Sequence, residues 1–316
     1  MYRYVLRRLA GAIPLLLVTS FIVFSFVHLA PGSPERILLG GRRVDAATLQ
    51  AIRDRYRLDD PFLVQYWHWL QNAVQGDLGE SIFFKDTVAS VVSGRLLATL
   101  ELAGYATVLV LVFGLVLGIV SAIKRGGPVD TVVSTVTLIS SSISAYVSGI
   151  LLIVIFPVTL GVFPVFGLGE GLSSRIYHLT LPAIALALAL MALVARVTRA
   201  SMGQVLEQEF VETARSRGFS ERRVVVKHAL RNALIPVLTI SGLVAGYLIS
   251  GAVLVEYTFG LNGLGAVLVQ AVLTKDFAVV QGVTLVFTAA FVFINLAVDL
   301  LYALVDPRVR LQQEVA

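Results

Sequence analysis

Few residues of this sequence have the type and spacing that chemistry requires. The four His residues, at positions 28, 68, 178 and 228, are scattered, and no H-E-x-x-H pair is present, so a His-based metal site is not favoured. None of the four Lys follows a Gly, which excludes a phosphate-binding loop of the G-x-x-x-x-G-K-[ST] type. A G-x-S-x-G nucleophile elbow is absent, and so is Cys. The sequence therefore predicts no catalytic, cofactor-binding or metal-binding residue.

Charge concentrates instead in one stretch between two apolar runs, residues 210–237. This stretch holds six Lys or Arg and two Glu. Leu206, Phe210 and Ala214 are spaced four residues apart, which places them on one face of a helix. They predict a short amphipathic helix whose apolar stripe they form.

The end of this helix is marked by Gly218, which is expected to adopt a left-handed backbone conformation there. Ser220 is expected to cap a second helix, and Pro236 to mark the entry to the next apolar run. A loop lying on anionic lipid headgroups is the alternative. That alternative explains the basic residues, but it does not explain the apolar stripe, the mixed charges or the Gly.

Apolar runs must position this stretch. The chain is 57% hydrophobic and 14% charged, whereas roughly a quarter of the residues of a soluble domain are charged. Because helices satisfy their own backbone hydrogen bonds in lipid, we predict an all-α integral membrane protein with six transmembrane helices. The third helix is the least hydrophobic, since Ser and Thr recur in its first half. The six runs cover residues 9–29, 97–123, 132–156, 179–199, 236–255 and 281–303.

Positive charges set the expected orientation. With both ends of the chain inside, the inner segments carry fifteen Lys or Arg, whereas the two short outer loops carry one each. This bias predicts cytoplasmic N- and C-termini. It places residues 30–95, between the first two helices, outside the membrane and residues 200–235 in the cytoplasm. The net charge of +5 is thus a topology signal and does not indicate nucleic-acid binding.

Small and hydroxyl-bearing residues within the apolar runs are the remaining candidates. Ser140, Ser141 and Ser144 of the third helix are candidates for lining a solute path. Plain packing is the alternative, since hydroxyls in membrane helices bond the preceding turn. Gly114 and Gly118 are four residues apart and predict close packing against another helix of this chain, with a subunit interface as the alternative.

The charged stretch also resembles a known family. Glu212-Thr213-Ala214-x-x-x-Gly218 resembles the E-A-A-x-x-x-G signature of ABC importer permeases, with Thr in place of the usual middle Ala. The wider stretch TARSRG…RRVVVKHALRNALIPV is similar to the dipeptide/oligopeptide/nickel subfamily, and in particular to its first permease subunit. Three further blocks resemble that subfamily in the same order, so the resemblance runs almost end to end. They are GDLGES at 76–81, VEYTFGLNGLG at 255–265 and VDLLYALVDPRVR at 298–310.

This resemblance implies a single permease domain over residues 1–316, with the fold of a type I ABC importer transmembrane domain, in the cytoplasmic (inner) membrane. Residues 206–219 would form the coupling helix that docks into a cytoplasmic ATPase. Residues 30–95 would face an external substrate-binding protein. The implied ATPase-coupling residues are Phe210, Glu212, Thr213, Ala214, Arg215 and Gly218, and the implied binding-protein contacts are Gly76, Asp77 and Gly79.

The resemblance also implies partners and a solute class. A second homologous permease, two ATPase subunits or domains and the binding protein would complete the importer. The ATPases would bind ATP and Mg, and this chain would be non-catalytic. Di- and oligopeptides are the expected solutes, with nickel, glutathione or another small solute as alternatives. A stand-alone secondary transporter or channel is the alternative outside this class.

Overall fold

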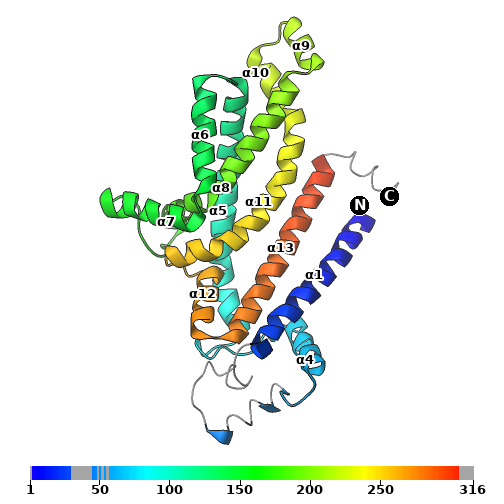
Figure 1. Cartoon of the computed structure of the whole chain (residues 1–316), viewed down its shortest axis with the longest axis vertical. Coiled ribbons are helices and arrows are strands. Elements are labelled where there is room, and N and C mark those ends of the chain that lie inside the picture. Colours follow the sequence, from blue (N-terminus) through cyan, green and yellow to red (C-terminus); the bar gives the residue numbers. More distant parts are fainter. Residues whose placement is uncertain (1, 30–44, 48–49, 51–52, 55–56, 306–316) are drawn as a thin grey trace. The chain divides into compact units, whose positions relative to one another are not determined.

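The computed structural model describes residues 2–29, 45–47, 50, 53–54 and 57–305 (Figure 1). Its regular elements are helices, among which η marks a π-helical turn, and the described residues add only an isolated bridge between Glu80 and Thr87. The all-α prediction is therefore confirmed. In chain order the helices are α1 (Tyr2–Leu29), α4 (Phe62–Val74), α5 (Val88–Ile123), α6 (Pro128–Ser142), α7 (Ala145–Ile153), η1 (Val154–Thr159), α8 (Leu172–Leu206), α9 (Glu209–Ser216), α10 (Glu221–Arg223), η2 (Val224–Ala229), α11 (Leu230–Thr258), α12 (Leu264–Thr274) and α13 (Phe277–Val305).

Membrane-spanning length is reached by four of the described helices, which lie in α5, α8, α11 and α13. The pair formed by α6 and α7–η1 passes the same test as a bent unit. The described apolar part of α1, Ala10–Phe26, is shorter than a full span. These elements follow the order of the six apolar runs, while the count of six spans and the orientation of the termini stay predictions.

The prediction of one continuous helix over residues 132–156 is wrong, because two helices, α6 and α7, occupy this run. α6 and α7 meet at 103° (Figure 1). Ile143 is extended between them, and the Ser144 hydroxyl accepts the Val147 amide and so caps α7. The Ser141 and Ser142 hydroxyls both donate to the Leu138 carbonyl in the last turn of α6. This run of hydroxyls competes with the helix for its backbone groups.

The chain folds into two compact units, Met1–Leu100 with Gly260–Phe293 and Glu101–Phe259 with Ile294–Ala316. In the second unit α8 is central, since it packs against α6, α7 and α11. Gly118 of α5 approaches α8 so closely that an added Cβ would lie 2.5 Å from the Thr198 Cβ, and a Cβ on Gly114 would lie 2.8 Å from that of Val194. The prediction that these glycines pack within the chain is confirmed.

The first unit has its own apolar core, in which the start of α5 packs with α12 and the start of α13. Sequence reasoning expected a short loop before the last helix and did not predict α12. This helix ends at Thr274, and the next residue, Lys275, has a left-handed φ of 57° that turns the chain into α13. The buried members of this core are Val88, Val91, Val92, Leu264, Val267, Ala271, Ala278, Val279 and Val283.

Candidate functional site

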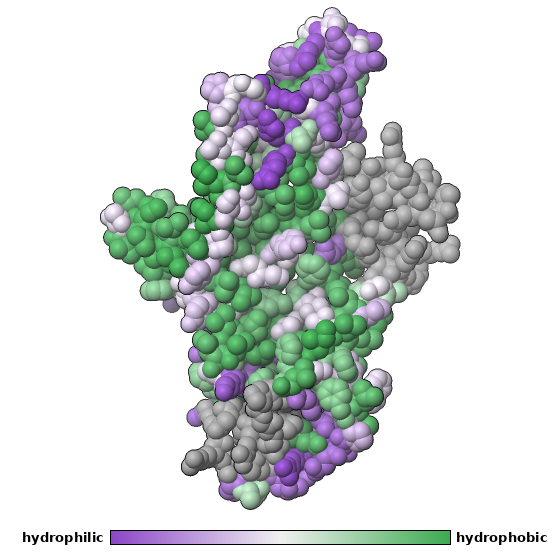
Figure 2. All heavy atoms as spheres, in the orientation of Figure 1, coloured by the Kyte–Doolittle hydropathy of each residue, from purple (hydrophilic) through white to green (hydrophobic). Residues whose placement is uncertain are grey.

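Hydrophilic side chains gather over α9 and α10 at one end of the second unit (Figure 2). α9 is short and amphipathic, with Val211 and Ala214 buried and the remainder of its side chains exposed. Phe210 is 39% exposed, among the charged and polar exposed side chains of this helix. Glu212 and Thr213 are exposed as well.

The predicted apolar stripe is corrected by where the helices begin and end. α8 ends at Leu206 and the extended residue Gln208 precedes α9, so Leu206 does not share a helix with Phe210. Ala214 packs with Val211 against the chain itself, and it is only 5% exposed. The buried cluster that holds this face comprises Ala122, Met202, Val205, Val211, Ala214, Val224, Val225, Ala229 and Ala233.

Gly218 ends α9 in the predicted left-handed conformation, with φ +78°. Its amide donates to the Arg215 carbonyl at 2.9 Å, and the Phe219 amide donates to the Ala214 carbonyl at 3.3 Å. This pair of bonds is the Schellman motif, which satisfies carbonyls left free at a helix end. A Cβ on Gly218 would meet no atom within 4 Å, so any penalty for a side chain there lies in the backbone.

The second helix of the charged stretch does not stop before the next apolar run. α10, η2 and α11 follow one another without a gap from Glu221 to Thr258, and Pro236 lies inside α11 and not at its entry. Ser220 is the residue before α10, but its side chain makes no capping hydrogen bond. Arg215 of α9 pairs with Glu221 at 2.8 Å, which joins the two helices across the turn.

A buried carboxylate close to this end was not anticipated. Asp130, at the start of α6, is 5% exposed. The Arg199 guanidinium of α8 donates to both of its oxygens, at 2.7 and 2.8 Å. The Gly126 amide donates at 2.9 Å, and the Ser121 hydroxyl donates as well. Four donors therefore tie α5, the following turn and α8 to α6, and such charge-assisted bidentate pairs are strong and geometrically specific.

The hydroxyls considered for a solute path lie at the other end of α6. Arg196 of α8 donates to the Ser141 hydroxyl at 3.3 Å, one turn before Arg199. Ser144 is exposed at the break between α6 and α7, and Ser140 is partly buried. α8 thus contacts α6 near both of its ends.

A compact turn in the first unit contains Gly76, Asp77 and Gly79. Both glycines have left-handed φ values, 89° and 88°, and the Asp77 carboxylate accepts the Gly79 amide at 2.9 Å. Ser81, at the end of the same block, donates to the Asp276 carboxylate, which also accepts the Phe83 amide at 3.1 Å. The GDLGES block is therefore a preformed turn fixed to the start of α13.

The entry to α5 is stabilised in a related way. The Ser90 hydroxyl and the Thr87 amide donate to the Asp86 carboxylate, each at 2.7 Å, and lower the pKa of that carboxyl below its usual value. Further along α5, Arg95 donates to Asn262 at 3.0 Å and the Thr99 hydroxyl accepts the Leu264 amide at 2.9 Å. These bonds hold the GLNGLG part of the block at 255–265. Within the described part of the chain, no three His, Asp or Glu side chains lie close enough together to hold a metal ion.

Comparison with known proteins identifies the family of this chain. Residues 114–311 match the family described as the binding-protein-dependent transport system inner membrane component. The chain belongs to this family. Residues 1–103 match the N-terminal family of the membrane components of the same transport systems. The permease is thus a non-catalytic, multi-pass inner-membrane component of an ABC importer.

Relatives cover the permease from end to end. It is 41% identical to the glutathione transport system permease protein GsiC of Escherichia coli strain K12, over 98% of this chain and 99% of that protein. It is 42% identical to GsiC of Pectobacterium atrosepticum with the same coverage. A chain of the inward-facing MetNI methionine ABC transporter has a TM-score of 0.57 at 20% identity, over 68% of the permease and 96% of that chain. This likeness identifies the fold as that of a type I ABC importer permease.

Proposed function

We propose that the permease forms the solute path together with a second homologous permease, and that two cytoplasmic ATPase subunits or domains drive it by binding ATP and Mg. An extracytoplasmic substrate-binding protein delivers the solute. Membership of a binding-protein-dependent transport family supports this assembly. In this arrangement residues 1–316 form one permease domain, with residues 30–95 outside and residues 200–235 in the cytoplasm.

Coupling to the ATPase is assigned to the exposed surface of α9. Phe210 supplies an apolar contact, and Glu212 and Thr213 supply polar ones. Arg215 is held in place by its pair with Glu221. Ala214 contributes indirectly, because its buried side chain packs α9 onto the rest of the unit. Gly218 sets the direction of the chain after the helix. The observation that carries this proposal is a helix whose buried face is occupied by its own chain while an aromatic side chain remains exposed.

We propose that the imported solutes are peptides, because the four sequence blocks resemble those of the peptide permease subfamily. Glutathione is a specific alternative because the GsiC relatives are named for it, and it is itself a small peptide. Uptake of labelled di- and tripeptides and of labelled glutathione, measured in a strain lacking its own peptide importers, tests the proposal. Uptake must require the permease, its ATPases and its binding protein together. Uptake that persists without the ATPases would support a stand-alone carrier instead.

The orientation can be tested with single cysteines, because the sequence contains no native Cys. Gln75 and Ser216 are both exposed, the first after α4 and the second at the end of α9. In intact cells we expect Gln75→Cys to react with an impermeant thiol reagent and Ser216→Cys to react only after permeabilisation. The reverse pattern would place α9 outside, where no ATPase can reach it.

The hydroxyls proposed to line the solute path are those of Ser140, Ser141 and Ser144, at the break between α6 and α7. We expect Ser141→Leu to lower the uptake rate several-fold, because the larger apolar side chain fills the space beside Arg196. Ser144→Asn keeps a capping side chain for α7 while adding bulk, and it is expected to lower uptake as well. Ser142→Leu is the neighbouring control, and the amount of assembled complex is measured for each variant. Normal uptake by Ser141→Leu and Ser144→Asn would remove this break from the path.

A further inference from the structure

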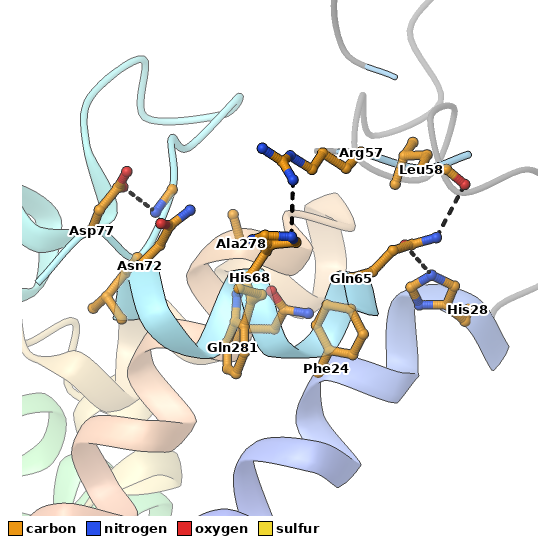
Figure 3. A pocket seen from close by; sticks show the side chains of 13 residues that line it. Phe24, His28, Arg57, Leu58, Gln65, His68, Asn72, Asp77, Ala278 and Gln281 are labelled. Carbon is orange, nitrogen blue, oxygen red and sulfur yellow. Dashed lines mark hydrogen bonds between the residues drawn. The ribbon is translucent and has the colours of Figure 1, made fainter. Parts of the chain in front are cut away.

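A pocket of about 290 Å³ lies within the first unit, and none of its lining residues belongs to α9 or to the break between α6 and α7 (Figure 3). Side chains from α1, α4 and α13 line it, together with the segments around residues 57–58 and 77–79. Its size is near the lower end of the roughly 300–1,000 Å³ found for small-molecule sites. An amino acid or a dipeptide is the size of solute that such a volume holds.

One wall of the pocket is aromatic. Phe24 of α1 and Trp69 of α4 both line it, and their ring centroids are 5.5 Å apart. Phe24 is 7% exposed, so its ring is fixed by its neighbours. Rigid aromatic rings offer an apolar surface for the body of a ligand at low entropic cost.

A positioned cation lies at the pocket rim. Arg57 donates to the His68 Nε2 at 2.9 Å, and Figure 3 shows the guanidinium directly opposite the imidazole. Among the described residues, the side-chain partner of Arg57 is the neutral-capable imidazole of His68 and not a carboxylate. Its φ of 49° lies in the left-handed region, which is uncommon for a residue other than Gly and is often retained for function.

The segment that carries Arg57 is held in place by a buried amide. Gln65 of α4 is 7% exposed, and its Nε2 donates to the Leu58 carbonyl at 3.0 Å and the Asp60 carbonyl at 2.8 Å. Its Oε1 lies 3.0 Å from the His28 Nε2. Because both the Nε2 and the Oε1 of Gln65 have hydrogen-bond partners, this side chain fixes the segment around residues 57–60 over α4. It thereby helps to hold Arg57 in position.

The opposite charge is supplied by Asp77, which also lines the pocket. Only its Oδ1 is used by the Gly79 amide, and Figure 3 shows Asp77 near Asn72, away from Arg57. A cation and an anion at separate places around an aromatic wall suit a ligand that carries both charges. Arginine binds carboxylates with paired donors, and a carboxylate accepts hydrogen bonds from an ammonium.

We propose that this pocket binds a small zwitterion of the amino-acid or dipeptide class, with its carboxylate at Arg57 and its ammonium at Asp77. The choice of a peptide-like ligand rests on the proposed function, but the site shares no residue with the coupling surface or with the proposed solute path. Such a site holds a solute on the permease itself, next to the turn that GDLGES forms.

The chain offers a direct reporter of binding. It contains two Trp residues, and Trp67 is 57% exposed whereas Trp69 lines the pocket. In a Trp67→Phe background of the purified transport complex, without the binding protein, the emission of Trp69 is taken as the difference from a matched Trp67→Phe, Trp69→Phe complex and is titrated with alanyl-leucine. We expect a saturable change, and an affinity lowered about tenfold or more by Arg57→Met and by Asp77→Asn, the loss of one charge contact each.

Capped ligands separate direct contacts from loosening of the fold. Alanyl-leucine amide lacks the carboxylate, so its weak binding is expected to be the same in the parent and in Arg57→Met. N-acetyl-alanyl-leucine lacks the ammonium, so Asp77→Asn is expected not to weaken it further. If each variant weakens the capped ligand as much as the free dipeptide, the residues only stabilise the pocket and the proposal is overturned.

Absence of any saturable change in Trp69 emission also overturns the proposal. Peptide uptake by the unmodified importer is measured in parallel. If peptide is taken up but does not bind at this pocket, the pocket is not a ligand site and the proposed function still holds. Failure to take up any peptide counts against the proposed function.

Discussion

Import is expected to be abolished when Gly218 is replaced by Val. Gly218 has a φ of +78° and closes the Schellman motif at the end of α9. A β-branched residue in this left-handed conformation costs about 1–2 kcal/mol or more. Since no neighbouring atom would contact the new Cβ, the cost is relieved by rotation of the backbone, which redirects the chain between α9 and α10.

Asn is the matched replacement at this position, because it tolerates the left-handed conformation better than other residues with a side chain. We expect Gly218→Asn to retain most of the uptake rate, and Gly218→Val to lose both uptake and capture of the ATPase in a pull-down. Membrane insertion, measured by the amount of permease in the membrane fraction, is expected to be normal in both. Full import by Gly218→Val would remove this turn from the coupling mechanism.

The headgroup-binding alternative makes the opposite prediction. It expects tolerance at Gly218 and sensitivity to removal of the basic side chains at Arg222, Arg223 and Lys227. Arg223 lies over the Phe219 ring at 4.7 Å, so its side chain also has a packing role. Replacing all three basic residues with Gln therefore removes their charge while keeping most of the side-chain length. Loss of import in the triple variant together with normal import by Gly218→Val would support binding to lipid headgroups.

Ala214 illustrates what helical periodicity can and cannot decide. Spacing placed Ala214 on the apolar face of a short helix, but the structure buries that side chain against its own chain and not on a surface open to a partner. Spacing could not choose between Leu206–Phe210–Ala214 and Val211–Ala214, because the choice depends on where α8 ends and α9 begins. Consequently a charged residue at Ala214 would disrupt packing within the chain, and the exposed Phe210 is the better position for probing a partner. Phe210→Ala is thus expected to weaken ATPase capture without unfolding the unit.

The long apolar runs were predictable because bilayer thickness imposes their length, and α5 and α8 follow them closely. The break at Ser144 was missed because it arises inside an uncharged run from local hydroxyl bonds that hydropathy does not measure. The Asp130–Arg199 pair was missed for a different reason. Its members are 69 residues apart, and Asp130 follows a Gly-Gly-Pro sequence that is typical of a loop.

The Asp130–Arg199 pair is the basis of the second prediction, because it lies between α9, the proposed coupling helix, and the proposed solute path at the break between α6 and α7. Arg199 of α8 holds the first turn of α6 through Asp130, and Arg196 of α8 contacts Ser141 in the last turn. α8 ends two residues before Gln208, the residue that precedes α9. We therefore expect a displacement of α9 to pass through α8 to both ends of α6, and so to its break with α7.

Removing one partner of this pair is expected to be severe. Arg199→Met leaves the buried Asp130 carboxylate with no cation, and we expect the melting temperature of the purified complex to fall by roughly 5 °C or more. Import is expected to fall about tenfold or more. Glu207→Gln is the control, because its pair with Arg125 at the same end of the unit is exposed on both sides and contributes little.

The charge swap distinguishes a simple ion pair from the arrangement in the structure. Exchanging the residues, Asp130→Arg with Arg199→Asp, restores opposite charges across the two helices. We expect no rescue, because the Ser121 hydroxyl and the Gly126 amide both donate to position 130 and would then face a guanidinium that has no acceptor. The neutral double variant, Asp130→Asn with Arg199→Met, is expected to be more stable than Arg199→Met alone, since it leaves no unpaired charge. Rescue of import by the swap would reduce the pair to electrostatics and remove the four-donor site from the coupling path.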